Sequence, residues 1–315
     1  MSKFADIYGH EQIKEHLQNA IRLNKVSHAY IFNGPMGSGK KMTAGIFAET
    51  LQCERHGQEP CGTCHSCIQS ESGNQPDIIW VHHEKPGSIG VDDVREQVIG
   101  DMQIKPYSSR YKIYIIDEAE KLTQQAQNAL LKTIEEPPAY GIIILLTTNA
   151  DTFLQTILSR CVRLDFRPLR DTLVTQYLQE KYDLTDYECR FATAFAQGKI
   201  GRAVTIATSK EFAQLKEEVM HVIRYAKEMT TAEIMAEVKN IANYKLTIDD
   251  YLDLMAMWYR DVLVFKSTKD SNALIFKDEM SLLAEQAKNC SYEGLEDILK
   301  SIDKVKLRLD RKSTR

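Results

Sequence analysis

The segment "AYIFNGPMGSGKKMT", residues 29–43, predicts the fold of the first half of this chain. Its four leading residues favour a buried strand, and the following turn fits the pattern of a phosphate-binding loop that opens a helix. Backbone N–H groups of such a turn, with the N-terminus of the next helix, bind phosphate oxygens. The candidate phosphate-binding residues are Gly34, Gly37, Gly39, Lys40 and Lys41.

Lys41 departs from the pattern. A Ser or Thr normally follows the loop lysine, and its hydroxyl helps to hold Mg²⁺. An ammonium has no lone pair to offer a metal, so it either repels Mg²⁺ or replaces its charge. The sequence therefore predicts weak or Mg²⁺-independent nucleotide binding with negligible hydrolysis, and a Thr at position 41 should strengthen Mg-ATP binding.

The composition bounds the class of protein. The chain has 315 residues, 43% hydrophobic and 27% charged, which is typical of a globular protein with two or three domains. We find no apolar run of membrane-spanning length and no signal-peptide core, so we expect a cytoplasmic protein. A net charge of −4 argues against nucleic-acid binding over the whole surface. The basic segment 301–315 is more simply a solvated helix end than a DNA-facing patch.

Strands and helices alternate up to residue 168. Apolar runs predict strands, helical periodicity predicts the segments between them, and Thr123 is the expected N-cap of one helix. Strands that are apolar throughout are typical of a parallel sheet covered on both faces. The rest of the chain is helical by pattern, with boundaries near 168 and 210. The predicted strands are 29–32, 77–81, 112–116, 142–148 and 162–166, and the predicted helices between them are 39–51, 91–102 and 123–136.

Two of these strands end in polar residues. Asp117 and Glu118 follow "IYII", at the strand end where ligands of open α/β sheets bind. In P-loop ATPases an Asp here helps to bind Mg²⁺, and the adjacent Glu is a candidate to orient the attacking water. Asn149, in "LLTTN", is a weaker candidate for the γ-phosphate or the water, since Thr-Asn after a strand is usually a turn.

Four of the seven cysteines fall within fifteen residues. Their spacing, with three in "CGTCHSC", predicts a closed tetrahedral Zn²⁺ site, which is structural because no ligand position remains for water. His65 is an alternative ligand, and free thiols or redox chemistry are the competing interpretation. Cys161, Cys189 and Cys290 are isolated and are expected to be packing residues. The four predicted ligands are Cys53, Cys61, Cys64 and Cys67.

These motifs, in this order, resemble the AAA+ clamp-loader subunits of the bacterial replicase. The resemblance rests on "HAYIFNGPMGSGK", the four-cysteine insert, "DEAEKLTQQAQNALLKTIEEPP", "TTN" and "SRC" at 159–161. It implies a fold that is α/β and then all-α. The implied domains are an AAA+ P-loop domain at 1–168 with a zinc module at 53–67, a helical lid at 169–209 and a helical collar at 210–315.

The resemblance also implies partners and roles. The family forms a five-subunit arc that opens a sliding clamp and places it on primer–template DNA, with ATP hydrolysed between neighbouring subunits. Arg160 in "SRC" matches the arginine finger that a non-hydrolysing stator subunit supplies in trans, and Arg202 matches a lid arginine that senses phosphate. The alternative is a motor subunit that hydrolyses ATP itself. A zinc-stabilised DNA-binding module and a P-loop kinase are poorer interpretations.

Overall fold

The chain folds into two compact units. In the computed structural model, residues 2–83, 85–226, 228–243 and 248–313 are described. The first unit runs up to Val174 and includes Gly198–Gly201, and the second contains Thr175–Gln197 and the described residues from Arg202 onward. In these ranges, no helix has the combination of length and apolar character that crossing a membrane requires.

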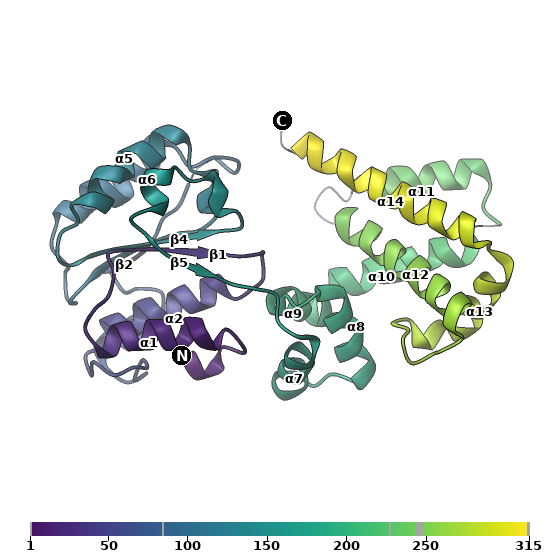
Figure 1. The fold of residues 1–315 in the computed structure, drawn as a ribbon, viewed down its shortest axis with the longest axis horizontal. Coiled ribbons are helices and arrows are strands. Elements are labelled where there is room, and N and C mark those ends of the chain that lie inside the picture. Colours follow the sequence, from purple (N-terminus) through teal and green to yellow (C-terminus); the bar gives the residue numbers. More distant parts are fainter. Residues whose placement is uncertain (1, 84, 227, 244–247, 314–315) are drawn as a thin grey trace. The chain divides into compact units, whose positions relative to one another are not determined.

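A five-stranded parallel sheet forms the centre of the first unit, as expected, in the order β2-β3-β4-β1-β5 (Figure 1). Strands β1, β3 and β4 are buried almost throughout, which explains why their sequences are apolar on both faces. Because the strands are parallel, the ends of β1, β3 and β4 that carry the predicted site lie at one edge of the sheet. The strands are β1 Ala29–Asn33, β2 Ile78–Trp80, β3 Lys112–Ile116, β4 Gly141–Thr147 and β5 Val162–Asp165.

Helices cover both faces of the sheet (Figure 1). One face packs on α1 and α2 through residues such as Leu17 and Phe47, and the other packs on α5 and α6 through residues such as Leu130 and Ile157. The predicted N-cap is confirmed, since the Thr123 hydroxyl accepts the Ala126 N–H at 3.2 Å. The helices are α1 Glu11–Arg22, α2 Lys40–Gln52, α3 His65–Glu71, α4 Val91–Val94, α5 Gln124–Glu135 and α6 Gln155–Leu158.

The predicted helix at 91–102 is helical but irregular. After α4 it continues as a π-helical segment, Arg95–Gly100, and a 3₁₀ turn, Asp101–Gln103. This winding buries Val98 and Met102 completely. Hydrophobic spacing alone does not distinguish such a π segment from a regular α-helix.

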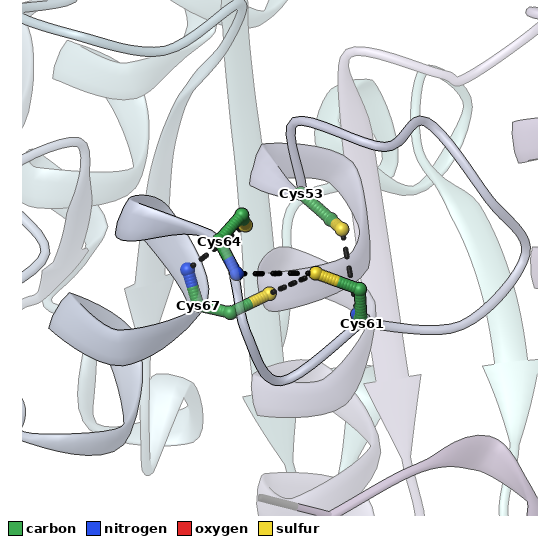
Figure 2. A group of neighbouring side chains, drawn as sticks. All are labelled: Cys53, Cys61, Cys64 and Cys67. Atoms are coloured by element: carbon green, nitrogen blue, oxygen red, sulfur yellow. Dashed lines mark hydrogen bonds between the residues drawn. The ribbon is translucent and has the colours of Figure 1, made fainter.

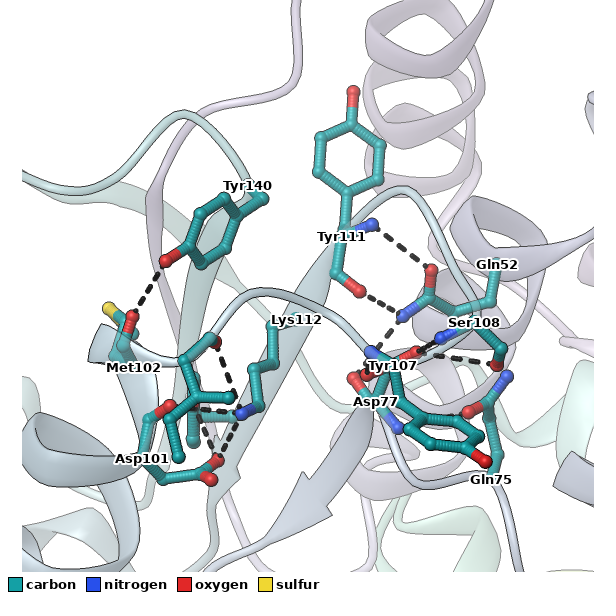
Figure 3. Close-up of polar contacts among 12 residues, drawn as sticks. Gln52, Gln75, Asp77, Asp101, Met102, Tyr107, Ser108, Tyr111, Lys112 and Tyr140 are labelled. Atoms are coloured by element: carbon teal, nitrogen blue, oxygen red, sulfur yellow. Dashed lines mark hydrogen bonds and ion pairs between the residues drawn. The ribbon is translucent and has the colours of Figure 1, made fainter.

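Two carboxylates, a buried one from Asp77 and a partly exposed one from Asp101, fix the start of β3 (Figure 3). Asp77 is 1% exposed and accepts the N–H groups of Tyr107, Ser108 and Ser109 at 2.6, 2.9 and 3.0 Å. Asp101 accepts from Lys112 at 2.9 Å and from the Tyr114 hydroxyl at 2.8 Å. These bonds anchor the loop that precedes β3, the strand that leads to Asp117.

The second unit is helical. Trp258 is fully buried beside Phe276, and its indole N–H donates to Gln286 at 2.9 Å. The basic segment 301–315 lies largely in the last helix, where Lys304 and Arg308 are exposed, and the side chains of residues 310–315 lie outside the described part. The helices of this region are α7 Asp171–Lys181, α8 Asp186–Ala196, α9 Ile200–Thr208, α10 Lys210–Tyr225, α11 Thr231–Asn243, α12 Ile248–Thr268, α13 Met280–Asn289 and α14 Tyr292–Ser313.

Candidate functional site

The predicted phosphate loop joins β1 to α2. Gly37 and Gly39 have φ angles of 77° and 93°, which only glycine adopts without strain. Gly34 is required for a different reason: a Cβ there would lie 2.4 Å from the carbonyl oxygen of Phe166. Gly201, at the start of α9, donates its N–H to the Gly37 carbonyl at 2.8 Å. The glycines therefore shape the loop and allow the start of α9 to pack closely against it.

Lys40 is folded onto its own loop. Its ammonium donates to the carbonyls of Gly34 and Pro35 at 2.5 and 2.8 Å, and the residue is 9% exposed. Burial lowers the pKa of Lys40, while the charges of Glu120 and Asp117 act to raise it. To contact a phosphate, Lys40 has to exchange these two carbonyls for phosphate oxygens.

Lys41 contacts the acid at the end of β3. Its ammonium lies 3.1 Å from the Asp117 carboxylate and 5.2 Å from the centre of the Trp80 ring. Lys41 and Asp117 both line a cavity of about 530 Å³. The remaining residues that line this cavity are Trp80, Val81, His82, His83 and Glu118.

Glu118 is held by local contacts. Its backbone is left-handed, with φ 50°, and its carboxylate accepts from Lys121 at 2.6 Å. His83 lies 3.6 Å from the same carboxylate oxygen. The side chain of Glu118 is half exposed at the cavity that Lys41 lines, so the structure brings Lys41, Asp117 and Glu118 together.

Asn149 caps a turn. Its side-chain oxygen accepts the Asp151 N–H at 3.0 Å, which is the ordinary role of Asn after a strand. Its neighbour Thr148 donates to Glu120 at 2.7 Å. Burial acts to raise the pKa of Glu120, but hydrogen bonds from Thr148 and Thr147 outweigh it and the pKa is lowered. A role of Asn149 toward phosphate stays a prediction.

The sequence interpretation missed a cavity of about 840 Å³ next to the loop. Residues 9–16 form one wall, and residues 163–173 form the other. His10 joins this cavity to the phosphate loop, since its Nε2 atom lies 3.1 Å from the Ser38 carbonyl oxygen. Gly9 and His10 both have positive φ. The glycine in "YGH", just before the first helix, is the sequence feature that could have indicated this turn.

Arg160 lies on the surface just after α6. Its guanidinium donates to the Thr156 carbonyl at 3.0 Å and lies 3.1 Å from the Glu135 carboxylate. Arg160 and Glu135 have side chains that are 41% and 43% exposed. An exposed pair of this kind contributes roughly 0–1 kcal/mol, so the guanidinium exchanges partners at low cost.

Arg202 is bound within the second unit. Its guanidinium donates to Asp250 and Asp253 of α12 at 2.6 and 2.8 Å and lies over the Phe195 ring. Lys306 donates to the same Asp253 at 2.5 Å. No pattern in the sequence indicates these partners, and a phosphate-sensing role for Arg202 stays a prediction.

The four cysteines predicted to bind metal converge (Figure 2). Their Sγ atoms all lie within 4.8 Å of one another, and those of Cys61 and Cys67 are 3.9 Å apart. Four sulfur ligands about 2.3 Å from a tetrahedral Zn²⁺ are about 3.8 Å apart, so this set fits the ion. Cys53 lies at the end of α2, Cys61 and Cys64 precede α3, and Cys67 lies in the first turn of α3. A metal would therefore tie the insert to α2.

Backbone N–H groups already point at these sulfur atoms. Those of Cys61, Cys64 and Cys67 donate to Cys53, Cys61 and Cys64 at 3.4, 3.3 and 3.4 Å. Hydrogen bonds from Thr63 lower the pKa of Cys61 to about 5, whereas burial raises the pKa of Cys53 and Cys67. A bound cation would stabilise all four thiolates. His65 is exposed on α3, outside the group of four.

Comparison with known proteins identifies the family. The profile described as "DNA polymerase III, delta subunit" matches residues 9–170, and the profile described as "DNA polymerase III, delta subunit, C terminal" matches residues 210–314. The chain belongs to the DNA polymerase III delta subunit family. The two profiles together cover the P-loop unit and most of the helical region.

Relatives of this family member include two kinds of DNA polymerase III subunit. Subunit delta' of Bacillus subtilis is 29% identical over 297 residues, which cover 93% of this chain and 88% of that protein. Subunit tau of Bacillus subtilis is 40% identical over 182 residues, 58% of this chain and 32% of that protein. Subunit tau/gamma of Haemophilus influenzae is 38% identical over 210 residues, 64% of this chain and 30% of that protein. The chain therefore spans about a third of the tau and tau/gamma relatives.

A solved structure supports the fold. A DNA polymerase III gamma subunit-related protein from Thermotoga maritima superposes with a TM-score of 0.52 at 20% identity, covering 91% of this chain and 98% of that one. With the parallel sheet and the helical remainder, this confirms the expected fold class, an α/β domain followed by an all-α region.

Proposed function

We propose that this chain is the delta-prime-type subunit of the DNA polymerase III clamp loader, a cytoplasmic replication protein. The observation that carries the proposal is the length of the delta' match, which extends through nearly all of both proteins, P-loop unit and helical region alike. The tau and tau/gamma relatives have higher sequence identity to this chain, but the matches cover only about a third of those proteins.

The proposed partners are the gamma/tau and delta subunits, in a hetero-pentamer that loads the sliding clamp onto primer–template DNA. In this assignment residues 1–168 form the AAA+ domain, 169–209 the lid and 210–315 the collar through which subunits associate. The four cysteines hold a structural Zn²⁺ and stabilise the segment 53–67. A closed site of this kind has no chemical step to perform.

The chain acts as a stator. Lys41 replaces the hydroxyl that would hold Mg²⁺ and lies against Asp117, so this subunit is not suited to Mg²⁺-dependent hydrolysis. Arg160 is exposed and weakly paired, as a residue that reaches a neighbouring subunit has to be. The function therefore lies in interfaces and in stabilising charge on phosphate bound to the adjacent motor subunit, through Arg160.

The competing candidate is an active gamma/tau-type ATPase subunit. Two observations favour it: Asp117 and Glu118 are both retained, and local identity to the tau relatives reaches 40%. In that case the chain would turn over ATP with its own P-loop, and Lys41 would be accommodated beside the metal.

Reconstitution separates the two candidates. We expect the isolated full-length chain to show no ATP turnover above background. Added to gamma/tau and delta subunits, it should complete an assembly whose ATPase is stimulated by clamp and primed DNA. Failure to co-purify with those subunits contradicts the proposed function, and turnover by the isolated chain at the rate of a motor subunit favours the alternative.

A further inference from the structure

The residues around the phosphate loop do not fit Mg²⁺. This ion requires near-octahedral oxygen coordination, usually with a loop hydroxyl and a carboxylate among its contacts. Lys41 stands at the hydroxyl position and lies 3.1 Å from Asp117, the carboxylate that would serve the metal. The next hydroxyl along α2, that of Thr43, is buried and donates to the Gly39 carbonyl at 2.9 Å. Neither side chain offers Mg²⁺ the missing ligand.

We propose that this loop binds the polyphosphate of a nucleotide without a divalent metal, with the Lys41 ammonium supplying the charge that Mg²⁺ supplies in motor subunits. The inference goes beyond the stator function and is independent of Arg160. It concerns binding alone, because no chemical step is assigned to the bound nucleotide.

Several features of the loop point to an anionic ligand. The first N–H groups of α2, a helix of thirteen residues, have no acceptor within the helix and are available to phosphate oxygens. Ser38, between two glycines of the loop, is 3% exposed, and its hydroxyl has no hydrogen-bond partner among the described residues. A buried hydroxyl without a partner is costly and indicates an acceptor that arrives with a ligand.

Two contacts hold the Lys41 ammonium in place. Asp117 binds its ammonium on one side, and the Trp80 ring lies 5.2 Å away, within cation–π range. The side chain is nevertheless 69% exposed, so the ammonium remains accessible to a phosphate group that enters the cavity. A charge already held near the phosphate loses less conformational freedom when a ligand binds.

Two lysines then share the ligand. Lys40 releases its two loop carbonyls to bind phosphate from one side, while Lys41 contacts it from the side of Asp117. Mg²⁺ would have to enter beside an ammonium, which repels it. Nucleotide affinity should therefore be insensitive to Mg²⁺ and should depend on the charge at position 41.

Calorimetric titration of the full-length chain with ATP tests this, once in excess Mg²⁺ and once in EDTA. We expect wild-type affinities that agree within about threefold in the two conditions. Lys41→Met should weaken binding in EDTA by roughly ten- to hundredfold, the usual cost of a lost charged hydrogen bond. Lys41→Thr should bind more tightly in Mg²⁺ than in EDTA. Inorganic tripolyphosphate should compete with ATP in EDTA, since the recognised group is phosphate.

Lys25→Met is the matched control. Lys25 is an exposed lysine in the loop before β1, and its replacement removes the same charge without touching the site, so ATP affinity should not change. The proposal is overturned if the wild-type chain binds no ATP in either condition, or binds it only with Mg²⁺. It is equally overturned if Lys41→Met and the wild type bind ATP alike in EDTA.

Discussion

Replacing Arg160 with alanine is expected to lower the rate of ATP hydrolysis at the neighbouring motor site by roughly 10³–10⁵, the range known for arginine fingers. The guanidinium would stabilise charge on the transferring phosphoryl group. Steady-state ATPase assays of the reconstituted loader, with clamp and primed DNA, measure the effect. Because motor sites at other interfaces continue to work, single-turnover measurement at the affected site is needed for the full factor.

Two matched variants separate the finger from a surface charge. Glu135→Gln removes the partner of Arg160 but keeps the guanidinium, so ATPase activity should be retained. Arg160→Lys keeps the charge but loses the planar fork, and most of the activity should be lost. Full activity of the Arg160→Ala assembly would show that this residue is not the finger.

Removal of zinc is the second large effect we expect. Structural Zn²⁺ binds zinc-finger peptides with roughly 10–16 kcal/mol, and in this chain part of that energy would join the 53–67 segment to α2. Chelation, or Cys64→Ser, should therefore lower the melting temperature markedly and release zinc in proportion. Differential scanning calorimetry with metal analysis on the same samples measures both quantities.

Cys290→Ser serves as the control, because Cys290 is far along the chain from the four-sulfur group and is not part of it. Its variant should keep one zinc ion per chain and respond to chelator as the wild type does. A wild-type melting curve that chelator leaves unchanged would contradict a structural metal. Purified chain with all four thiols free and no bound zinc would do the same.

Much of the first unit was predictable because its signals are local. Strands buried on both faces are apolar throughout, so β1, β3 and β4 can be predicted from continuous runs of apolar residues. The loop glycines and the Thr123 cap are dictated by backbone geometry within a few residues. The four cysteines lie within fifteen residues of one another, so their spacing alone predicts that they come together in the fold.

The unpredicted features depend on contacts between distant residues. Trp80 contacts Lys41 because β2 and α2 pack in the same core. Neither segment has a sequence pattern that predicts this contact. Arg202 finds Asp250 and Asp253 about fifty positions away, and the cavity beside His10 needs residues from both 9–16 and 163–173. Such pairings follow from the packed fold rather than from any pattern in the sequence.

The most direct test of the stator account removes the candidate general base from this chain alone. A loader reconstituted with Glu118→Gln in this subunit should load clamps at the wild-type rate, within about twofold, because no ATP is hydrolysed at its own P-loop. Losing a general base in a working ATPase site costs roughly 10²–10⁴ in rate. A fall of that size in clamp loading would contradict the account and show that this subunit is a motor.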